Sequence, residues 1–251
     1  MTDSADSVAP EQRPRHIAVI MDGNGRWARQ RALPRHFGHR AGVKSVRAVV
    51  RRCGELEIDY LTVFAFSSEN WSRPREEVVG LMKLFLDALQ REVAELHENN
   101  VRLRFVGDLS RLSTRLQTAM HEAESLTAGN TGLQLQVAVG YGGRWDILNG
   151  CRELARAAAQ GDLNADDITE TQFAEAMSLR GAPDVDLMIR TGGERRVSNF
   201  LLWHMAYAEL HFSETLWPDY DAIELDEAVI AFSRCDRRFG RVEPVAHEEV
   251  G

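Results

Sequence analysis

The sequence predicts an α/β protein, a single domain with a mainly parallel central sheet flanked by helices. Short apolar segments with the pattern of strands alternate with longer segments that have the pattern of helices. Several of the strand segments are apolar enough to be covered on both faces. With 251 residues, 44% of them hydrophobic, the chain can bury one sizeable core. We therefore expect one sheet with helices on both of its faces.

Five segments have the pattern of buried strands. The first, HIAVIM, and the second, YLTVFAF, are almost entirely apolar, and the third, VRLRFVG, alternates polar and apolar residues. The fourth, LQLQVAVGYG, begins with the same alternation, and the fifth is VDLMIR. These strands cover residues 16–21, 60–66, 101–107, 133–142 and 185–190.

Apolar spacing and helix start and stop signals predict the helices between and after these strands. The expected spans are about 41–57, 74–99, 110–128, 144–160, 170–179 and 226–239. Residues 15–240 form the predicted domain, whereas residues 1–14 and 241–251 are polar and are expected to be disordered tails.

Charge and composition narrow the class of partner. The formal net charge of −8 argues against a surface that binds nucleic acid, and we expect no nucleic-acid partner. Residues 26–52, however, carry eight arginines and Lys44 without any acidic residue, so this segment is expected to meet an anion. No window is apolar enough for a membrane-spanning helix and no signal peptide is recognisable, which predicts a cytoplasmic protein.

Polar loops follow three of the predicted strands. They read DGNGRW over residues 22–27, SSENWSR over 67–73 and RTGGERRVS over 190–198. Each combines arginine with glycine or hydroxyl residues, the groups that approach and bind phosphate oxygens. Because the carboxyl ends of parallel strands meet at one edge of a sheet, the three loops are expected to converge there and to bind more than one phosphate.

Asp22 is the exception in the first loop, because a carboxylate repels an anion unless a cation lies between them. We therefore expect Asp22 to bind Mg²⁺, which commonly bridges carboxylates and substrate phosphates. An alternative is a Rossmann-type dinucleotide-binding oxidoreductase, since residues 23–28 satisfy GxGxxG/A after a strand. Asp22 and the lack of an acidic residue about 20 positions further on argue against it.

Four longer blocks carry a resemblance to a known family. HIAVIMDGNGRWA, FAFSSENWSRP, GYGGRWDI and DLMIRTGGERRVSNFLLWHMAYAEL together resemble the cis-prenyltransferases, most closely the bacterial undecaprenyl diphosphate synthases. The resemblance spans about residues 15–240, with the blocks in family order. It implies a Mg²⁺-dependent enzyme that condenses isopentenyl diphosphate repeatedly onto farnesyl diphosphate. The expected product is a long cis-polyprenyl diphosphate, undecaprenyl diphosphate, the lipid carrier precursor for peptidoglycan and other cell-wall polysaccharides.

The resemblance also implies roles for residues of the first two loops. Asp22 is expected to be catalytic and to hold the magnesium. The expected ligands of the allylic diphosphate are Gly23, Asn24, Gly25, Arg26, Trp27, Arg35 and His39. Asn70 is expected to assist removal of the C2 proton of isopentenyl diphosphate, and since an amide is a weak base its role is to orient or relay. Further substrate contacts are expected from Ser67, Ser68, Glu69, Trp71 and Arg73.

The last block supplies the expected site for isopentenyl diphosphate, namely Arg190, Arg196, Val197 and Ser198. Glu209 matches a second acidic position near the metal. Arg195 stands where related synthases can carry histidine. Residues 238–240, Arg-Phe-Gly, match an element that reaches the site across a dimer, or they form a helix C-cap.

Three further expectations follow from the resemblance. The helix over residues 74–99 is expected to flank an apolar tunnel for the growing chain, with Ala65, Val101 and Leu133 at its wall and floor. A homodimer is expected, with transient contact to the membrane surface for product release, peripheral at the inner face of the plasma membrane. A non-catalytic accessory subunit remains an alternative, and the retained Asp22, Asn70, Arg190, Arg196 and Glu209 oppose it.

Overall fold

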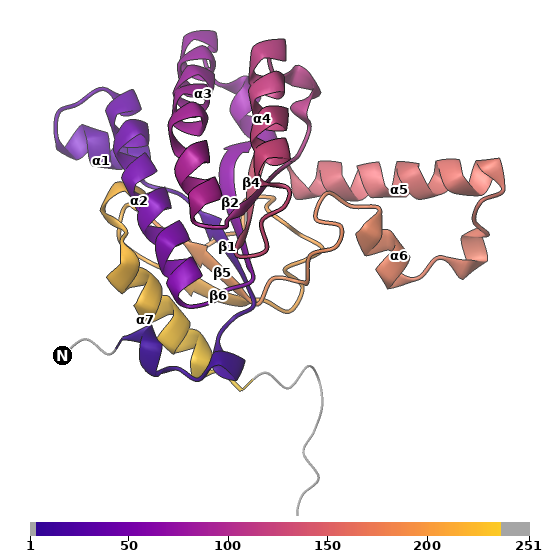
Figure 1. Cartoon of the computed structure of the whole chain (residues 1–251). Helices are drawn as coiled ribbons and strands as arrows, with labels where there is room; N and C mark the ends of the chain where they lie inside the picture. Colours follow the sequence, from indigo (N-terminus) through magenta and orange to yellow (C-terminus); the bar gives the residue numbers. More distant parts are fainter. Residues whose placement is uncertain (1–3, 237–251) are drawn as a thin grey trace, which may run out of the picture.

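The structure is a computed structural model that describes residues 4–236, and it contains one parallel six-stranded sheet (Figure 1). The strands are β1 (His16–Ile20), β2 (Tyr60–Ser67), β3 (Arg102–Val106), β4 (Gln134–Tyr141), β5 (Leu187–Arg190) and β6 (Glu209–Phe212). Their order is β3-β4-β2-β1-β5-β6, and every neighbouring pair is parallel. The five predicted strands are confirmed. The sequence did not predict β6, because this four-residue edge strand is only partly buried and lacks an apolar pattern.

The helices of the described residues are α1 (Asn24–Gln30), α2 (Arg35–Glu55), α3 (Arg75–Glu98), α4 (Thr114–Thr127), α5 (Gly143–Gln160), α6 (Glu170–Glu175) and α7 (Ala222–Ser233). All six predicted helices are present, but α2 begins six residues earlier than expected, directly after Pro34. The seven-residue α1 was not predicted. Of the helix expected over 226–239, the described part starts four residues early, after the N-cap Asp221, and ends at Ser233. Residues 237–240, including the Arg-Phe-Gly element, lie outside the described residues, as does the tail at 241–251.

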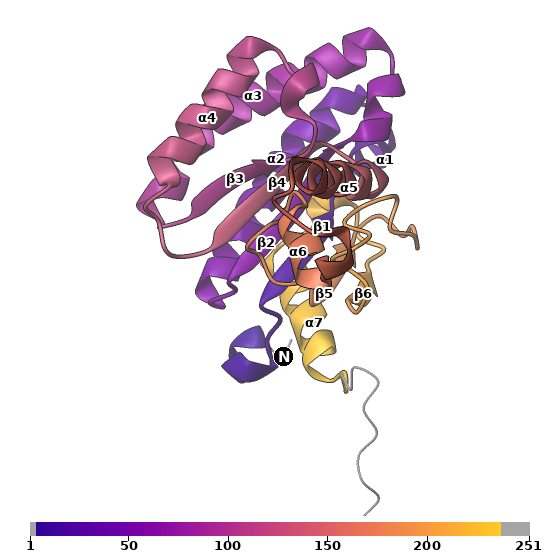
Figure 2. The same cartoon turned by 90° about the vertical axis from the view of Figure 1, so that its right-hand side faces the viewer.

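The two faces of the sheet are covered differently, which corrects the expectation of helices on both. On one face, α2, α3, α4 and α7 form the main core with the strands. The other face is covered largely by irregular chain, whose Phe200, Leu201 and Met205 are buried against it. Phe200 stacks on Phe64 of β2 at 4.3 Å between ring centroids. Helix α5 extends away from the sheet together with α6, and it is seen almost end-on in Figure 2.

The N-terminal segment differs from the disordered tail that was expected over residues 1–14. Residues 5–7 and 10–12 form 3-10 turns, and Ala5 is completely buried. The segment is attached through Arg52 of α2, whose guanidinium pairs with Asp6 at 3.1 Å and with Asp226 of α7 at 2.7 Å. A composition argument misses this attachment because it depends on partners in α2 and α7, which are distant along the chain.

Replacing Arg52 by methionine is expected to destabilise the fold by about 3 kcal/mol, because it leaves the largely buried Asp226 carboxylate without its cationic partner. Urea denaturation followed by circular dichroism would measure the change. The matched control is Arg51→Met, since the Arg51 side chain is 71% exposed and lies 3.8 Å from Glu95. Equal midpoints for the two variants would show that Arg52 does not hold the segment.

Candidate active site at the carboxyl edge of the sheet

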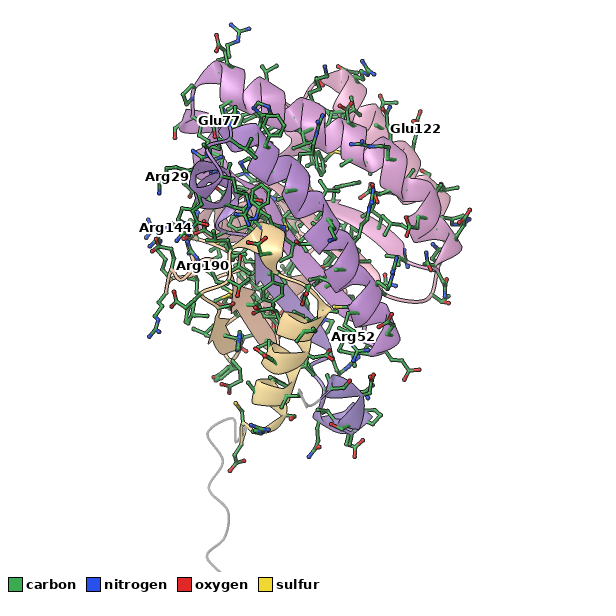
Figure 3. All side chains as sticks on the ribbon, turned by 90° about the vertical axis from the view of Figure 1, so that its left-hand side faces the viewer. Arg29, Arg52, Glu77, Glu122, Arg144 and Arg190 are labelled. Carbon is green, nitrogen blue, oxygen red and sulfur yellow. The ribbon has the colours of Figure 1, made fainter. Side chains whose placement is uncertain are left out.

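The three polar loops meet at the carboxyl edge of the sheet, as their positions after β1, β2 and β5 predict. Residues from all three line one cavity of about 410 Å³: Asp22, Ser67, Asn70, Arg73, Arg190 and Ser198. In Figure 3 the side chains of Arg29, Glu77, Arg144 and Arg190 lie on one side of the molecule, and Arg52 lies apart from them.

Asp22, two residues after the end of β1, lies between two arginines. Its Oδ2 accepts a hydrogen bond from Nη2 of Arg190 at 2.9 Å, and its Oδ1 lies 3.2 Å from Nη2 of Arg26. The Gly23 N–H donates to Oδ1 at 2.6 Å. Burial alone would raise the pKa of Asp22, but Arg190, the Gly23 N–H and Arg26 together hold this pKa below the ordinary value. Asp22 is therefore an anion at neutral pH, held among cations at the rim.

Arg190, the last residue of β5, is only 4% exposed. Its Nη1 donates to the carbonyl oxygen of Arg196 at 2.6 Å and to Oγ of Ser198 at 2.7 Å, while its Nη2 donates to Asp22. One guanidinium thus connects the loop after β1 with the loop after β5. This fork fixes the position of Ser198 relative to Asp22.

The turn after Arg190 lies close to the Asp22 loop. The Thr191 hydroxyl donates to the carbonyl oxygen of Asp22 at 2.7 Å, and Arg26 donates to the carbonyl oxygen of Gly192. Gly192 has φ +84°, and a Cβ there would lie 2.6 Å from Nη2 of Arg26. Thr191 and Gly192 were not among the predicted site residues. The TGG sequence directly after a buried strand was the signal for such a close approach.

Helix α1 is packed tightly against α2 beside the rim. A Cβ at Gly38 of α2 would overlap the carbonyl oxygen of Asn24, so only glycine permits this contact. Next to α1 lies a second hollow of about 400 Å³, whose lining includes Gly23, Gly25, Arg26, Arg29 and Arg35. Four of these were predicted to bind the allylic diphosphate, and Arg29 was not predicted.

The loop after β2 forms the 3-10 helix η3 (Ser68–Ser72). Its Asn70 is held by a capping box, in which the Asn70 Oδ1 accepts from the Ser67 N–H at 3.2 Å. Arg73 follows and pairs with Glu77 at 3.1 Å, and Arg35 lies 3.5 Å from the same carboxylate. Burial and the positive charge of Arg35 lower the pKa of Arg73.

His39 of α2 is a neutral side chain at the cavity. Burial, together with the charges of Arg35 and Arg73, lowers its pKa to about 4. Its Nε2 is buried without a hydrogen-bond partner within residues 4–236, and the same holds for Oδ1 of Asn24 and Nε of Arg190. All three residues line the 410 Å³ cavity. Such unpaired buried polar atoms are costly, so their concentration at this rim indicates a polar ligand.

Below the polar rim the cavity is apolar. Its wall includes Val46, Ala65, Leu81, Met82, Phe85 and Phe105, drawn from α2, α3 and the strands. Ala65 is exposed although it belongs to β2, where the pairing with β4 shifts register between Phe64 and Phe66. Val101 and Leu133, expected at the tunnel floor, are buried but do not line the cavity.

Glu209 is not brought to this rim within the chain. It is the first residue of β6 and pairs with Leu187, whereas Arg190, beside Asp22, pairs with Phe212. Within one chain, Glu209 thus lies at the opposite end of its strand from the rim, and the geometry of the single chain does not support the expectation that it shares a metal with Asp22. Glu214 is an acidic residue of the chain beside the loop after β5, since its Oε2 lies 2.5 Å from the position of a Cβ at Gly193.

Four of the predicted site residues, Trp27, Trp71, Arg196 and Val197, lie outside the lining of the cavity. Nε1 of Trp27 donates to Asp219 at 2.7 Å, and the Trp71 ring packs on Phe66 and under the guanidinium of Arg111. Arg196 is exposed and pairs with Glu194 at 2.5 Å. The side chains of Trp27, Trp71 and Arg196 do not line the cavity. Val197 packs partly against the core on the irregularly covered face.

The residues of the rim suit a magnesium ion that is bound partly by the protein and partly by substrate phosphates. No group of three or more His, Cys, Asp or Glu residues within 4–236 could hold a metal. Asp22 offers one carboxylate, flanked by arginines that suit phosphate oxygens. Magnesium often binds through one or two carboxylates plus substrate phosphates, and this donor set matches that mode.

Comparisons with known proteins agree with this geometry. Residues 20–240 match the prenyltransferase family described as "Putative undecaprenyl diphosphate synthase". The ditrans,polycis-undecaprenyl-diphosphate synthase ((2E,6E)-farnesyl-diphosphate specific) of Escherichia coli strain K12 is 53% identical over 235 residues, 94% of this chain and 93% of that protein. An isoprenyl transferase of Neisseria gonorrhoeae is 55% identical over 228 residues, 91% of this chain and 90% of that protein.

Two solved structures share the fold. A lavandulyl diphosphate synthase from Lavandula x intermedia, in complex with dimethylallyl diphosphate, superimposes with a TM-score of 0.89 and 36% identity over 92% of this chain and 100% of that one. A probable undecaprenyl diphosphate synthase from Campylobacter jejuni superimposes with a TM-score of 0.77 and 34% sequence identity. The match covers 91% of this chain and 99% of that one. Family match, identity and fold agree along nearly the whole chain. The chain therefore belongs to the undecaprenyl diphosphate synthase family of cis-prenyltransferases.

Proposed function

We propose that this protein condenses isopentenyl diphosphate repeatedly onto farnesyl diphosphate and releases a long cis-polyprenyl diphosphate, undecaprenyl diphosphate. The single observation that carries the proposal is the cavity, in which a rim of Asp22, Arg190 and Ser198 opens onto apolar walls. A charged head group and a growing hydrocarbon tail need these two surfaces next to each other. The 53% identity to the farnesyl-diphosphate-specific enzyme supports the choice of starter.

The arginines counter the repulsion between two substrates. Two unit charges of the same sign about 6 Å apart repel by roughly 3 kcal/mol at an effective dielectric constant near 20. Arg26 of α1 and Arg35 of α2 hold the allylic diphosphate, while Arg190 and Ser198 hold isopentenyl diphosphate. Holding both in place brings C1 of the allylic substrate to C4 of isopentenyl diphosphate. The same cations stabilise the departing diphosphate when the C1–O bond breaks.

Asp22 is the carboxylate that would hold Mg²⁺, with the remaining ligands supplied by diphosphate oxygens and water. Bound there, the metal would neutralise charge on the leaving diphosphate. Glu209 is left out of this assignment, because it lies at the other end of β6. Asn70 orients isopentenyl diphosphate for loss of its C2 proton, since a neutral amide held by a capping box is a poor base.

The test incubates purified full-length protein with farnesyl diphosphate and labelled isopentenyl diphosphate, with Mg²⁺ or with a chelator, and sizes the extracted lipids. Long labelled products that appear only with metal are the expected result. Absence of labelled lipid with every allylic starter would support an accessory subunit instead. Retention of a nicotinamide cofactor through purification would support the dinucleotide alternative.

We also propose that the protein works as a homodimer. The edge strand β6 and the segment before it expose Tyr207 by 69% and Leu210 by 47%, and the projecting α5 exposes Leu148 by 48%. An open parallel edge with exposed apolar side chains is a ready surface for a second copy. Light scattering after size exclusion should give twice the chain mass of 28.3 kDa. A mass of one chain at micromolar concentration would refute the dimer.

We place the protein in the cytoplasm, with transient contact to the inner face of the plasma membrane for product release. No helix within residues 4–236 is long and apolar enough to cross a membrane. The turn between α1 and α2 exposes Leu33 and the first turn of α2 exposes Phe37, each by 38%, among the arginines of the acid-free segment. Such a surface suits anionic lipid. Flotation with anionic vesicles but not neutral ones is expected, and equal flotation with both would refute a charge-dependent contact.

A further inference from the structure

Asn199, which follows Ser198 in the loop after β5, contacts both the start of α5 and the 3-10 helix η3. Its carbonyl oxygen accepts from the Gly143 N–H at 2.6 Å, and its Oδ1 accepts from the Arg144 N–H at 2.9 Å. Its Nδ2 donates to Oε1 of Glu69 in η3 at 2.8 Å. One residue therefore connects the start of α5 with the helix η3 that carries Asn70.

The backbone around Asn199 explains why this connection is needed. Ser198, Asn199 and Leu201 have φ of +46°, +61° and +38°, in the left-handed region that residues other than glycine and asparagine seldom adopt. Such a conformation persists only when its surroundings hold it. Here the contacts of Asn199 hold it, and Oγ of Ser198 consequently meets Nη1 of Arg190 at 2.7 Å.

The contact between Asn199 and Glu69 is close and charged. Burial alone would raise the pKa of Glu69, but hydrogen bonds, foremost the one from Asn199, bring this pKa below the ordinary value. Gly142 lies beside the same contact, since a Cβ there would overlap Oγ of Ser68 and lie 2.8 Å from Nδ2 of Asn199. A larger residue at position 142 would therefore push Asn199 away from η3, which carries Ser68 and Glu69.

We infer that Asn199 is a positioning residue that keeps η3 and the loop after β5 at a fixed separation, so that Asn70 and Ser198 act on the same isopentenyl diphosphate molecule. The inference rests on the proposed function. Arg190 and Ser198 bind the diphosphate, and Asn70 faces the carbon that loses its proton. Asn199 touches neither substrate. The allylic diphosphate is held beside α1, to which Asn199 makes none of its hydrogen bonds, so its binding is independent of this residue.

The test uses Asn199→Asp, which keeps the size, the tolerance for positive φ and the acceptor for Arg144, but places a carboxylate against Glu69. We expect kcat/KM for isopentenyl diphosphate to fall about 100-fold, with the KM for farnesyl diphosphate changed less than about 3-fold. In the double variant with Glu69→Gln, the glutamine amide can donate to the new carboxylate at position 199. The added cost relative to Glu69→Gln alone should then be less than about 5-fold. Asn149→Asp, on α5, is the matched charge control and should behave as wild type.

A second readout does not depend on turnover. Amide hydrogen exchange of residues 67–73, without substrate, should be at least about 10-fold faster in Asn199→Asp and return toward wild type with Glu69→Gln. Should Asn199→Asp fold poorly, Asn199→Gly keeps the backbone conformation and should show the same faster exchange without rescue. Unchanged exchange in 67–73 would overturn the inference. If the wild type lacks the proposed activity while exchange responds as expected, the proposed function fails and the connection between the loops stands.

Discussion

Replacing Asp22 by alanine is expected to reduce turnover at least about 1,000-fold while leaving the fold intact. The change removes the carboxylate that would bind the metal, together with the acceptor for Arg190 and the partner of Arg26. Both arginines remain charged, so an anion can still bind. The loss is therefore expected in kcat more than in the KM of either diphosphate.

The measurement is steady-state turnover together with the thermal midpoint from circular dichroism. The Asp22 side chain is 32% exposed, so its removal leaves no buried cavity, and we expect the midpoint to shift by a few degrees at most. Asp59→Ala is the matched control, since this carboxylate is 48% exposed and pairs with Arg15 at the other end of the sheet. Loss of folding in Asp22→Ala, with Asp59→Ala intact, would give Asp22 a structural role instead.

Arg190→Lys is expected to raise the KM for isopentenyl diphosphate about 100-fold. Lysine keeps the positive charge, but a single ammonium group cannot meet Asp22, Ser198 and the carbonyl oxygen of Arg196 with the same planar geometry. Because Arg190 is only 4% exposed, its lost hydrogen bonds are not replaced by water. The variant should also be less stable than the wild type by about 2 kcal/mol.

Initial rates against isopentenyl diphosphate concentration, at saturating farnesyl diphosphate, measure this effect. Arg195→Lys is the control, because Arg195 is exposed and lies further along the same loop. A KM within about 3-fold of wild type for Arg190→Lys would mean that charge alone suffices. The hydrogen bonds by which the Arg190 guanidinium joins the loops after β1 and β5 would then not determine substrate binding.

The meeting of the three polar loops could be predicted from the sequence, because it depends only on the topology of a parallel sheet. Parallel strands deliver the loops after β1, β2 and β5 to one edge whatever their side chains, so Asp22 and Arg190 could be placed together although 168 residues separate them. Glu209 shows the limit of this reasoning. Its position depends on where β6 begins and on its register with β5, and a four-residue edge strand carries no pattern that fixes either.

Asn199 and Gly38 could not be identified for a different reason. Each acts through a contact with a distant segment, Asn199 with Glu69 and α5, and Gly38 with the backbone of α1. An asparagine after a serine, or a glycine inside a helix, has many ordinary explanations in a sequence. The part of α2 that the sequence did not predict includes Gly38, which packs on α1.

The central claim is that one cavity takes the allylic diphosphate at the Asp22 rim and the hydrocarbon chain between its apolar walls. A crystal structure with Mg²⁺, isopentenyl diphosphate and an unreactive thio analogue of farnesyl diphosphate tests it most directly. We expect a metal joining Asp22 to diphosphate oxygen, a second diphosphate on Arg190 and Ser198, and the farnesyl chain against Ala65 and Phe85. Diphosphates bound away from Asp22, or a farnesyl chain outside the cavity, would contradict the account.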